Sequence, residues 1–135
     1  MSIVHTALAA CAVAVVMASP SSFAAAEAYI ISPQDGETVK SPFVVRFGLK
    51  GMGVAPAGVE MPGTGHHHLI VDAPLPPAGQ PVPFDDKHKH FGKGQTETEL
   101  SLPPGEHTLQ LILGDHTHMP HDPPVTSRQI RIRVE

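Results

Sequence analysis

From Ala28 to the end of the chain, short apolar runs alternate with segments rich in proline and glycine, and none of the runs has helical periodicity. The alternation is clearest in "FVVRFGLK", where Phe43, Val45 and Phe47 lie on one side of an extended chain. Six such runs are clear, at 28–32, 43–50, 66–72, 95–102, 103–114 and 125–135. A seventh, weak run at 81–84 could form a short edge strand. Short strands joined by frequent turns predict an all-β fold, an antiparallel β-sandwich of immunoglobulin-like type with about seven strands.

The first part of the chain has a different character. Residues 7–18, "ALAACAVAVVMA", form an apolar run shorter than the roughly 20 residues of a transmembrane helix, and small residues follow it. This pattern is typical of a secretory signal peptide. We predict a signal peptide at 1–26, cleaved after Ala24 or Ala26, and a single domain at 27–135 that is periplasmic or secreted and has no membrane span. A lipoprotein signal at Cys11 is the alternative, although Cys11 lies inside the apolar run rather than after it.

Cysteine content and charge limit the chemistry of the predicted domain. Cys11 is the only cysteine, so the mature domain has neither a disulfide nor a thiolate ligand. The formal net charge is −4, and the chain has one Tyr and no Trp. Without a basic stripe or many aromatic stacking surfaces, nucleic acid is not expected as a partner.

Three histidine motifs point to metal chemistry: "HHH" at 66–68, "HKH" at 88–90 and "HTH" at 116–118. In an extended chain the first and third residues of each motif project to the same side, so two imidazoles can share an ion. Neutral imidazole binds first-row metals at about 2 Å. With no cysteine and several methionines nearby in sequence, the donor set favours copper or zinc over calcium or magnesium. The predicted metal ligands are His66, His68, His88, His90, His116 and His118.

The predicted topology indicates how these motifs could meet. Strands of such a sandwich alternate in direction, so the second, fourth and sixth loops open at the same end. If the weak strand near Val82 is formed, all three motifs lie at one pole of the sandwich. Without it, the 88–90 motif is expected at the opposite end.

Several of these residues also have a structural interpretation. His107 begins a strand after a turn, and we expect its ring to bond a loop carbonyl. His67 faces away from its two neighbours, and His121 could cap a turn with Asp122. The methionines of the Gly/Pro-rich loop, Met52 and Met61, are expected to fill space rather than to bind metal.

Three segments resemble the hallmark motifs of a known family: "GTGHHHLIVD", "HKHFGKGQTETEL" and "LQLILGDHTHMPHDPPVTSRQIRI". The family comprises small bacterial secreted domains and is catalogued as a domain of unknown function. The resemblance spans about Ser32 to Val134 and implies an exported, β-rich domain, with no established activity.

Two better-known families offer a comparison. The composition is similar to that of periplasmic copper chaperones, but their His-x-Met pair is absent because Met119 directly follows His118. Segments 88–94 and 114–118 faintly resemble copper/zinc superoxide dismutase, whose disulfide the mature chain lacks. A dismutase-like enzyme is therefore disfavoured.

Two hypotheses of different classes follow. The first is a non-catalytic protein that binds or handles a transition metal, copper or zinc, through histidines at one pole, with another envelope protein as a possible partner. The second is a structural or interaction module of the cell envelope whose histidines form a hydrogen-bonded network. Metal content distinguishes the two.

Overall fold

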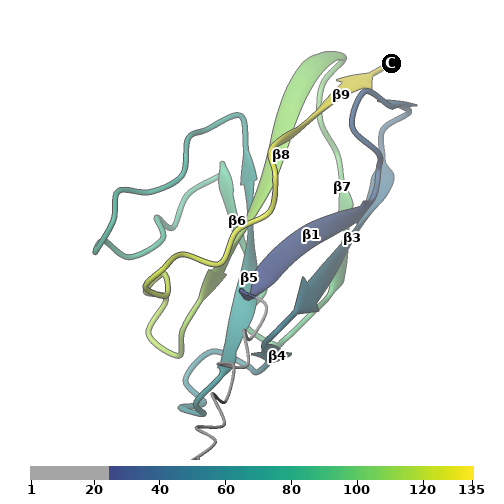
Figure 1. The fold of residues 1–135 in the computed structure, drawn as a ribbon. Coiled ribbons are helices and arrows are strands. Elements are labelled where there is room, and N and C mark those ends of the chain that lie inside the picture. The colour runs from purple at the N-terminus through teal and green to yellow at the C-terminus, as the bar shows by residue number, and fades with distance from the viewer. Residues whose placement is uncertain (1–24) are drawn as a thin grey trace, which may run out of the picture.

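The computed structural model describes residues 25–135, and the predicted signal peptide, apart from its last two residues, lies outside them. The described residues form two facing sheets and no helix (Figure 1). The predicted all-β sandwich is confirmed. No helix within the described residues is long and apolar enough to cross a membrane.

The smaller sheet has three strands in the order β1-β3-β7. They are β1 (Glu27–Ser32), β3 (Phe43–Lys50) and β7 (Glu97–Leu100), and β3 pairs antiparallel with both neighbours. The larger sheet has the order β2-β9-β8-β5-β4, and β6 also pairs with β5. Its strands are β2 (Thr38–Val39), β4 (Gly53–Val54), β5 (Thr64–Val71), β6 (His88–His90), β8 (Gly105–Gly114) and β9 (Ile130–Val134).

The main hydrophobic core lies between the two sheets. Alternate residues of each strand enter it, as in β3, whose burial alternates from Phe43 to Phe47. The larger sheet contributes Leu69 and Val71 of β5 and their neighbours on β8 and β9. Burial of this continuous apolar layer is the main stabilising contribution to the fold.

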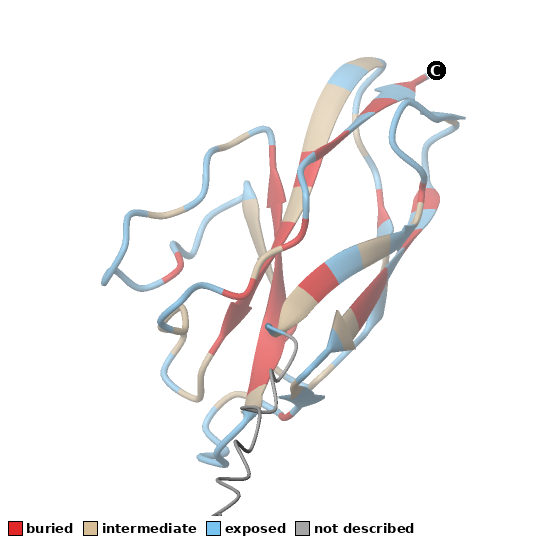
Figure 2. Ribbon diagram, viewed as in Figure 1, coloured by how far each residue is buried: buried red, intermediate tan, exposed pale blue. Residues whose placement is uncertain are grey.

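The larger sheet is also covered on its outer face, the face turned away from the main core. Figure 1 shows the long connections after β5 and after β8 on this side. Val82 of the first connection packs there against Ile70 and Ile112. As a result every residue of β5 after Thr64 is buried, and β5 is red along nearly all of its length in Figure 2. Polar side chains on the outer face of β5 are therefore enclosed.

The predicted edge strand at 81–84 is absent. Prolines at 81 and 83 remove the amide donors that a ladder requires, and Val82 instead donates its N–H to the carbonyl oxygen of His118. The edge strand forms a few residues later, as β6. The prediction that the 88–90 motif lies at the far end without a strand near Val82 is therefore wrong, because this motif is itself a strand that pairs with β5.

Candidate metal site

The centre of the site lies on β5. Because side chains alternate along a strand, His66 and His68 project to the outer face, where their ring centroids are 4.7 Å apart. His67 projects into the main core, with its ring centroid 5.3 Å from that of Phe47. All three histidines are buried. The predicted division of the "HHH" motif between two faces is confirmed.

Strand β6 adds a third imidazole to the outer face. His90 lies directly opposite His68 in the antiparallel register of β5 and β6. Its ring centroid is 5.2 Å from that of His68 and 5.0 Å from that of His66. One nitrogen from each of the three rings lies within 4.8 Å of the others. These three side chains, the histidine triad, could hold a metal ion.

A fourth histidine approaches the triad from the connection after β8. The ring centroid of His118 is 4.8 Å from that of His90, 5.0 Å from that of His66 and 6.0 Å from that of His68. The Nε2 atoms of His118 and His90 are 3.0 Å apart. Both rings are only partly buried, whereas His66 and His68 are enclosed. The more accessible side of the cluster is therefore formed by His90 and His118.

Hydrogen bonding accounts for few of the ring nitrogens. Both nitrogens of His66 and Nδ1 of His68 are buried without a hydrogen-bond partner. An unsatisfied buried polar atom costs about 1–3 kcal/mol, and most such atoms in native proteins are paired. A metal ion at the centre of the triad would satisfy nitrogen lone pairs that the described residues leave unpaired. The histidine triad could therefore hold a metal ion, and Nε2 of His90 and Nε2 of His118 lie within hydrogen-bond distance of each other.

The environment keeps these imidazoles neutral, which is the form that binds metal. Burial, reinforced by repulsion from His90 and His118, lowers the pKa of His66 to about 4. Burial and the neighbouring histidines lower the pKa of His68 to about 3. The pKa of His90 is also lowered, by burial and then by His118. Metal binding near neutral pH would therefore require little proton release from these three rings.

Two glycines make room for the rings. A β-carbon at Gly92 would collide with the ring of His90. A β-carbon at Gly114, which lies opposite His66 on β8, would be 2.7 Å from Cε1 of His68 and 3.3 Å from Cα of His118. The site thus depends on small residues as well as on histidines, and inspection of histidine spacing alone did not identify them.

Comparison with known proteins places the chain in a family. Residues 45–135 match the model of the family described as Domain of unknown function (DUF4399), which is more than half of the 135 residues. The chain belongs to this family. The match begins within β3 and includes all four clustered histidines of the DUF4399 domain. No curated protein and no solved structure matches the chain.

Of the six predicted ligands, the DUF4399 domain brings His66, His68, His90 and His118 together and leaves two apart. His88 lies on the same strand as His90, but its Nδ1 is 2.6 Å from Oδ1 of Asp85. His116 precedes His118 in the same turn and makes none of the ring contacts found among the clustered histidines. Asp85 thus holds the ring of His88, and the main chain of His116 is held by a distant loop, since its carbonyl oxygen accepts a hydrogen bond from the N–H of Gly58.

The site lies on the outer face of the larger sheet, near the end of β8, and not among loop tips at a pole. Antiparallel pairing of β6 with β5 brings His90 to His68. The turn after β8 then brings His118 to the same face. The three predicted motifs therefore converge, but strand pairing rather than loop direction is the cause.

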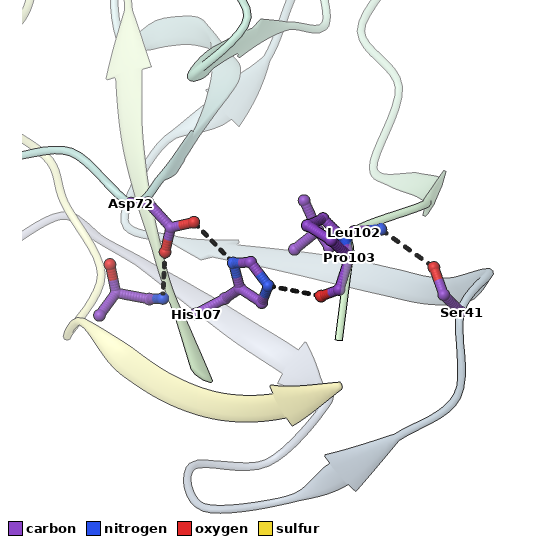
Figure 3. A network of polar contacts seen from close by, with 6 residues as sticks. Ser41, Asp72, Leu102, Pro103 and His107 are labelled. Atoms are coloured by element: carbon purple, nitrogen blue, oxygen red, sulfur yellow. Dashed lines mark hydrogen bonds and ion pairs between the residues drawn. The ribbon is translucent and has the colours of Figure 1, made fainter. Parts of the chain in front are cut away.

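The remaining histidines among residues 25–135 have structural partners or lie in the core. His107 bonds the carbonyl oxygen of Pro103 through Nε2 at 2.8 Å, as predicted, and Oδ2 of Asp72 through Nδ1 at 2.6 Å (Figure 3). His121 does not cap a turn with Asp122; its Nε2 lies 3.2 Å from the carbonyl oxygen of Thr64. That contact ties the last long loop to the start of β5.

Proposed function

We propose that this domain binds and handles a transition-metal ion, copper in the first place, through the histidine triad on the outer face of β5 and β6. The observation that carries the proposal is the set of enclosed, unpaired ring nitrogens of His66 and His68, with a ring nitrogen of His90 within 4.8 Å of a nitrogen of each. Buried polar atoms without partners are rare in native proteins, and a metal ion is the partner that suits several converging imidazoles.

The donor chemistry supports copper. Nitrogen sites without thiolate follow the Irving–Williams order, in which Cu²⁺ binds more tightly than Zn²⁺ and the other divalent first-row ions. The described residues contain no cysteine that could favour a softer ion. Zinc is the alternative that the same ligands accommodate.

We further propose that the protein works outside the cytoplasm and does not catalyse a reaction. The leader-like sequence at 1–26 supports export. The enclosed position of His66 and His68 supports retention of an ion rather than turnover of a substrate on it. An exported protein of this kind would exchange its ion with another protein of the cell envelope.

Metal titration tests the proposal. The full chain, expressed without an affinity tag, is titrated with Cu²⁺ and with Zn²⁺ against a chelator of known affinity, and bound metal is counted by elemental analysis. We expect one ion per chain and tighter binding of Cu²⁺. His90→Ala should weaken binding by at least about tenfold, since it removes a ligand.

The chain offers a matched control for this change. His88→Ala removes an imidazole from the same short strand, two residues away, but one that Asp85 holds. It should leave the affinity within about twofold of the wild type, because the ring of His88 is not part of the histidine triad. A wild-type protein without bound metal, or equal losses in the two variants, would contradict the proposal.

A further inference from the structure

The segment from Asp115 to Met119, here termed the Asp115 turn, is closed by an unusual concentration of hydrogen bonds on one oxygen. Oδ1 of Asp115 accepts from the N–H of Thr117 at 2.8 Å, from Oγ1 of Thr117 at 2.8 Å and from the N–H of Met119 at 3.0 Å. Main-chain bonds join Asp115 N–H to the carbonyl oxygen of Met119 and His118 N–H to that of Asp115. One carboxylate therefore organises the whole turn.

The turn holds His118 in an unfavourable backbone conformation. Its φ is 69°, in the left-handed region, which is sterically unfavourable for a residue with a β-carbon. Such conformations persist when surrounding contacts over-determine them, and they gather at functional sites. Here those contacts are the five hydrogen bonds of the Asp115 turn, and the consequence is that the ring of His118 lies against His90.

His118 differs from the triad in how it is supported. His66, His68 and His90 lie on strands whose backbone is fixed by pairing within the sheet. His118 lies on a turn, and the Asp115 carboxylate that closes this turn is only partly buried. Hydrogen bonds near the surface open more readily than those of a central strand. Opening of the Asp115 turn would therefore displace His118 and leave the strand-borne triad in place.

The position of His118 suits a ligand. Two nitrogens that each lie about 2 Å from one ion are about 3 Å from each other, and the Nε2 atoms of His90 and His118 are 3.0 Å apart. We propose that the Asp115 turn is a clasp that supplies His118 as the fourth metal ligand, that Asp115 is the residue positioning it, and that opening of the clasp governs release of the ion. This inference rests on the proposed function.

Four variants test the clasp: Asp115→Ala, Asp115→Asn, His118→Ala and the double variant Asp115→Ala/His118→Ala. Because all three side-chain hydrogen bonds end on Oδ1, asparagine can keep them with its amide oxygen, whereas alanine loses them. The full chain is loaded with Cu²⁺. Release to excess chelator is followed by stopped flow, equilibrium affinity is measured by competition, and the number of bound nitrogens is counted by electron paramagnetic resonance.

We expect Asp115→Ala to speed Cu²⁺ release and to weaken affinity by about 10–100-fold, the range typical of residues that orient ligands. Four nitrogens should become three in a large fraction of the sample. His118→Ala should show the same loss, and Asp115→Asn should stay close to the wild type. In the His118→Ala background, Asp115→Ala should have no further effect on affinity or release, since it acts only through His118.

Each alternative has its own signature. If the wild type binds no Cu²⁺, the proposed function fails. If the wild type binds Cu²⁺ and His118→Ala keeps the same nitrogen count and release rate, the clasp is wrong while the triad stands. If Asp115→Ala weakens binding equally with and without His118, Asp115 acts on the fold and not as a positioning residue. Thermal unfolding of each metal-free variant shows whether a changed affinity accompanies a changed fold.

Discussion

The Nε2 atoms of His90 and His118 lie 3.0 Å apart, although 28 residues separate them in the chain. Neither residue belongs to the strand that carries the buried histidines. His90 arrives by pairing of β6 with β5, and His118 by a left-handed turn after β8. Two unrelated local structures thus bring these two rings within hydrogen-bond distance of each other, and each ring centroid lies 5.0 Å from that of His66.

The left-handed backbone of His118 leads to a prediction about stability. His118→Gly and His118→Ala both remove the imidazole, but glycine adopts a positive φ without the steric penalty of a β-carbon. In metal-free protein, His118→Gly should therefore be more stable than His118→Ala by about 1 kcal/mol. Chemical denaturation of the two variants measures the difference. Equal stabilities would show that the turn has relaxed to another conformation.

The room provided by Gly114 leads to a second prediction. Gly114→Ala places a methyl group 2.7 Å from Cε1 of His68, so this ring must shift. Overpacking of this kind typically costs about 1–3 kcal/mol, and displacement of a ligand should weaken Cu²⁺ binding at least about tenfold. Urea denaturation and metal competition measure the two effects.

Gly53→Ala is the control for this substitution. Its added β-carbon would be 3.5 Å from Cγ2 of Thr64, an ordinary contact, and Gly53 lies on the short strand β4 at the edge of the same sheet. Stability and metal affinity should both stay near the wild type. Unimpaired Cu²⁺ binding by Gly114→Ala would argue that His68 is not a ligand.

The depressed histidine pKa values make stability depend on pH. The pKa of His66 and that of His67 fall from 6.5 to about 4, and that of His68 to about 3, chiefly through burial. Between about pH 6.5 and 4 the unfolded chain binds more protons than the folded domain, so the free energy of unfolding falls as the pH falls. Metal-free protein should be clearly less stable at pH 4.5 than at pH 7.5 in denaturation experiments.

His67 allows this pH effect to be assigned. It lies in the main core, outside the metal cluster, and both of its ring nitrogens lack hydrogen-bond partners. His67→Leu should remove one linked proton, which flattens the acid slope by about 1.4 kcal/mol per pH unit. Near pH 7 the variant should be as stable as the wild type or more so, since the unpaired polar atoms are gone. An unchanged acid slope would mean that the ring of His67 takes up its proton as readily in the folded domain as in the unfolded chain.

The sequence predicted those parts of the fold that are local. Strong apolar alternation predicted β3 with its observed bounds, 43–50, and the opposite directions of His66 and His67 follow from the period of any strand. Strand β6 was missed because its residues, "HKH", have no apolar alternation of their own. It forms because the exposed edge of β5 offers hydrogen-bond partners, and that is a property of the assembled sheet.

The choice among the six predicted ligands depended on contacts that the histidine pattern alone does not reveal. His88 and His90 lie on the same short strand, β6, yet the ring of His88 is held by Asp85, three residues earlier in the chain. His116 and His118 differ because the backbone of the Asp115 turn reverses between them. The signal available in the sequence was "DHT", an aspartate two residues before a threonine, which is typical of a side-chain-capped turn.

The last prediction concerns His107, whose ring joins β8 to two other segments (Figure 3). Burial opposes its charge, but the hydrogen bonds and charge of Asp72 and the carbonyl of Pro103 prevail, so its pKa is raised above 6.5. His107→Ala should lower the free energy of unfolding by about 1–3 kcal/mol, because two hydrogen bonds are lost, one of them to the carboxylate of Asp72. The loss should be largest below pH 6.5 and should shrink as the pH rises through the folded-state pKa.

His107 and Gly114 are seven residues apart on β8, about 23 Å along an extended strand, so Cu²⁺ affinity should not change. Parallel denaturation and metal competition at pH 6 and pH 8 check both statements, and a loss of metal affinity in His107→Ala would show that the two ends of β8 are coupled.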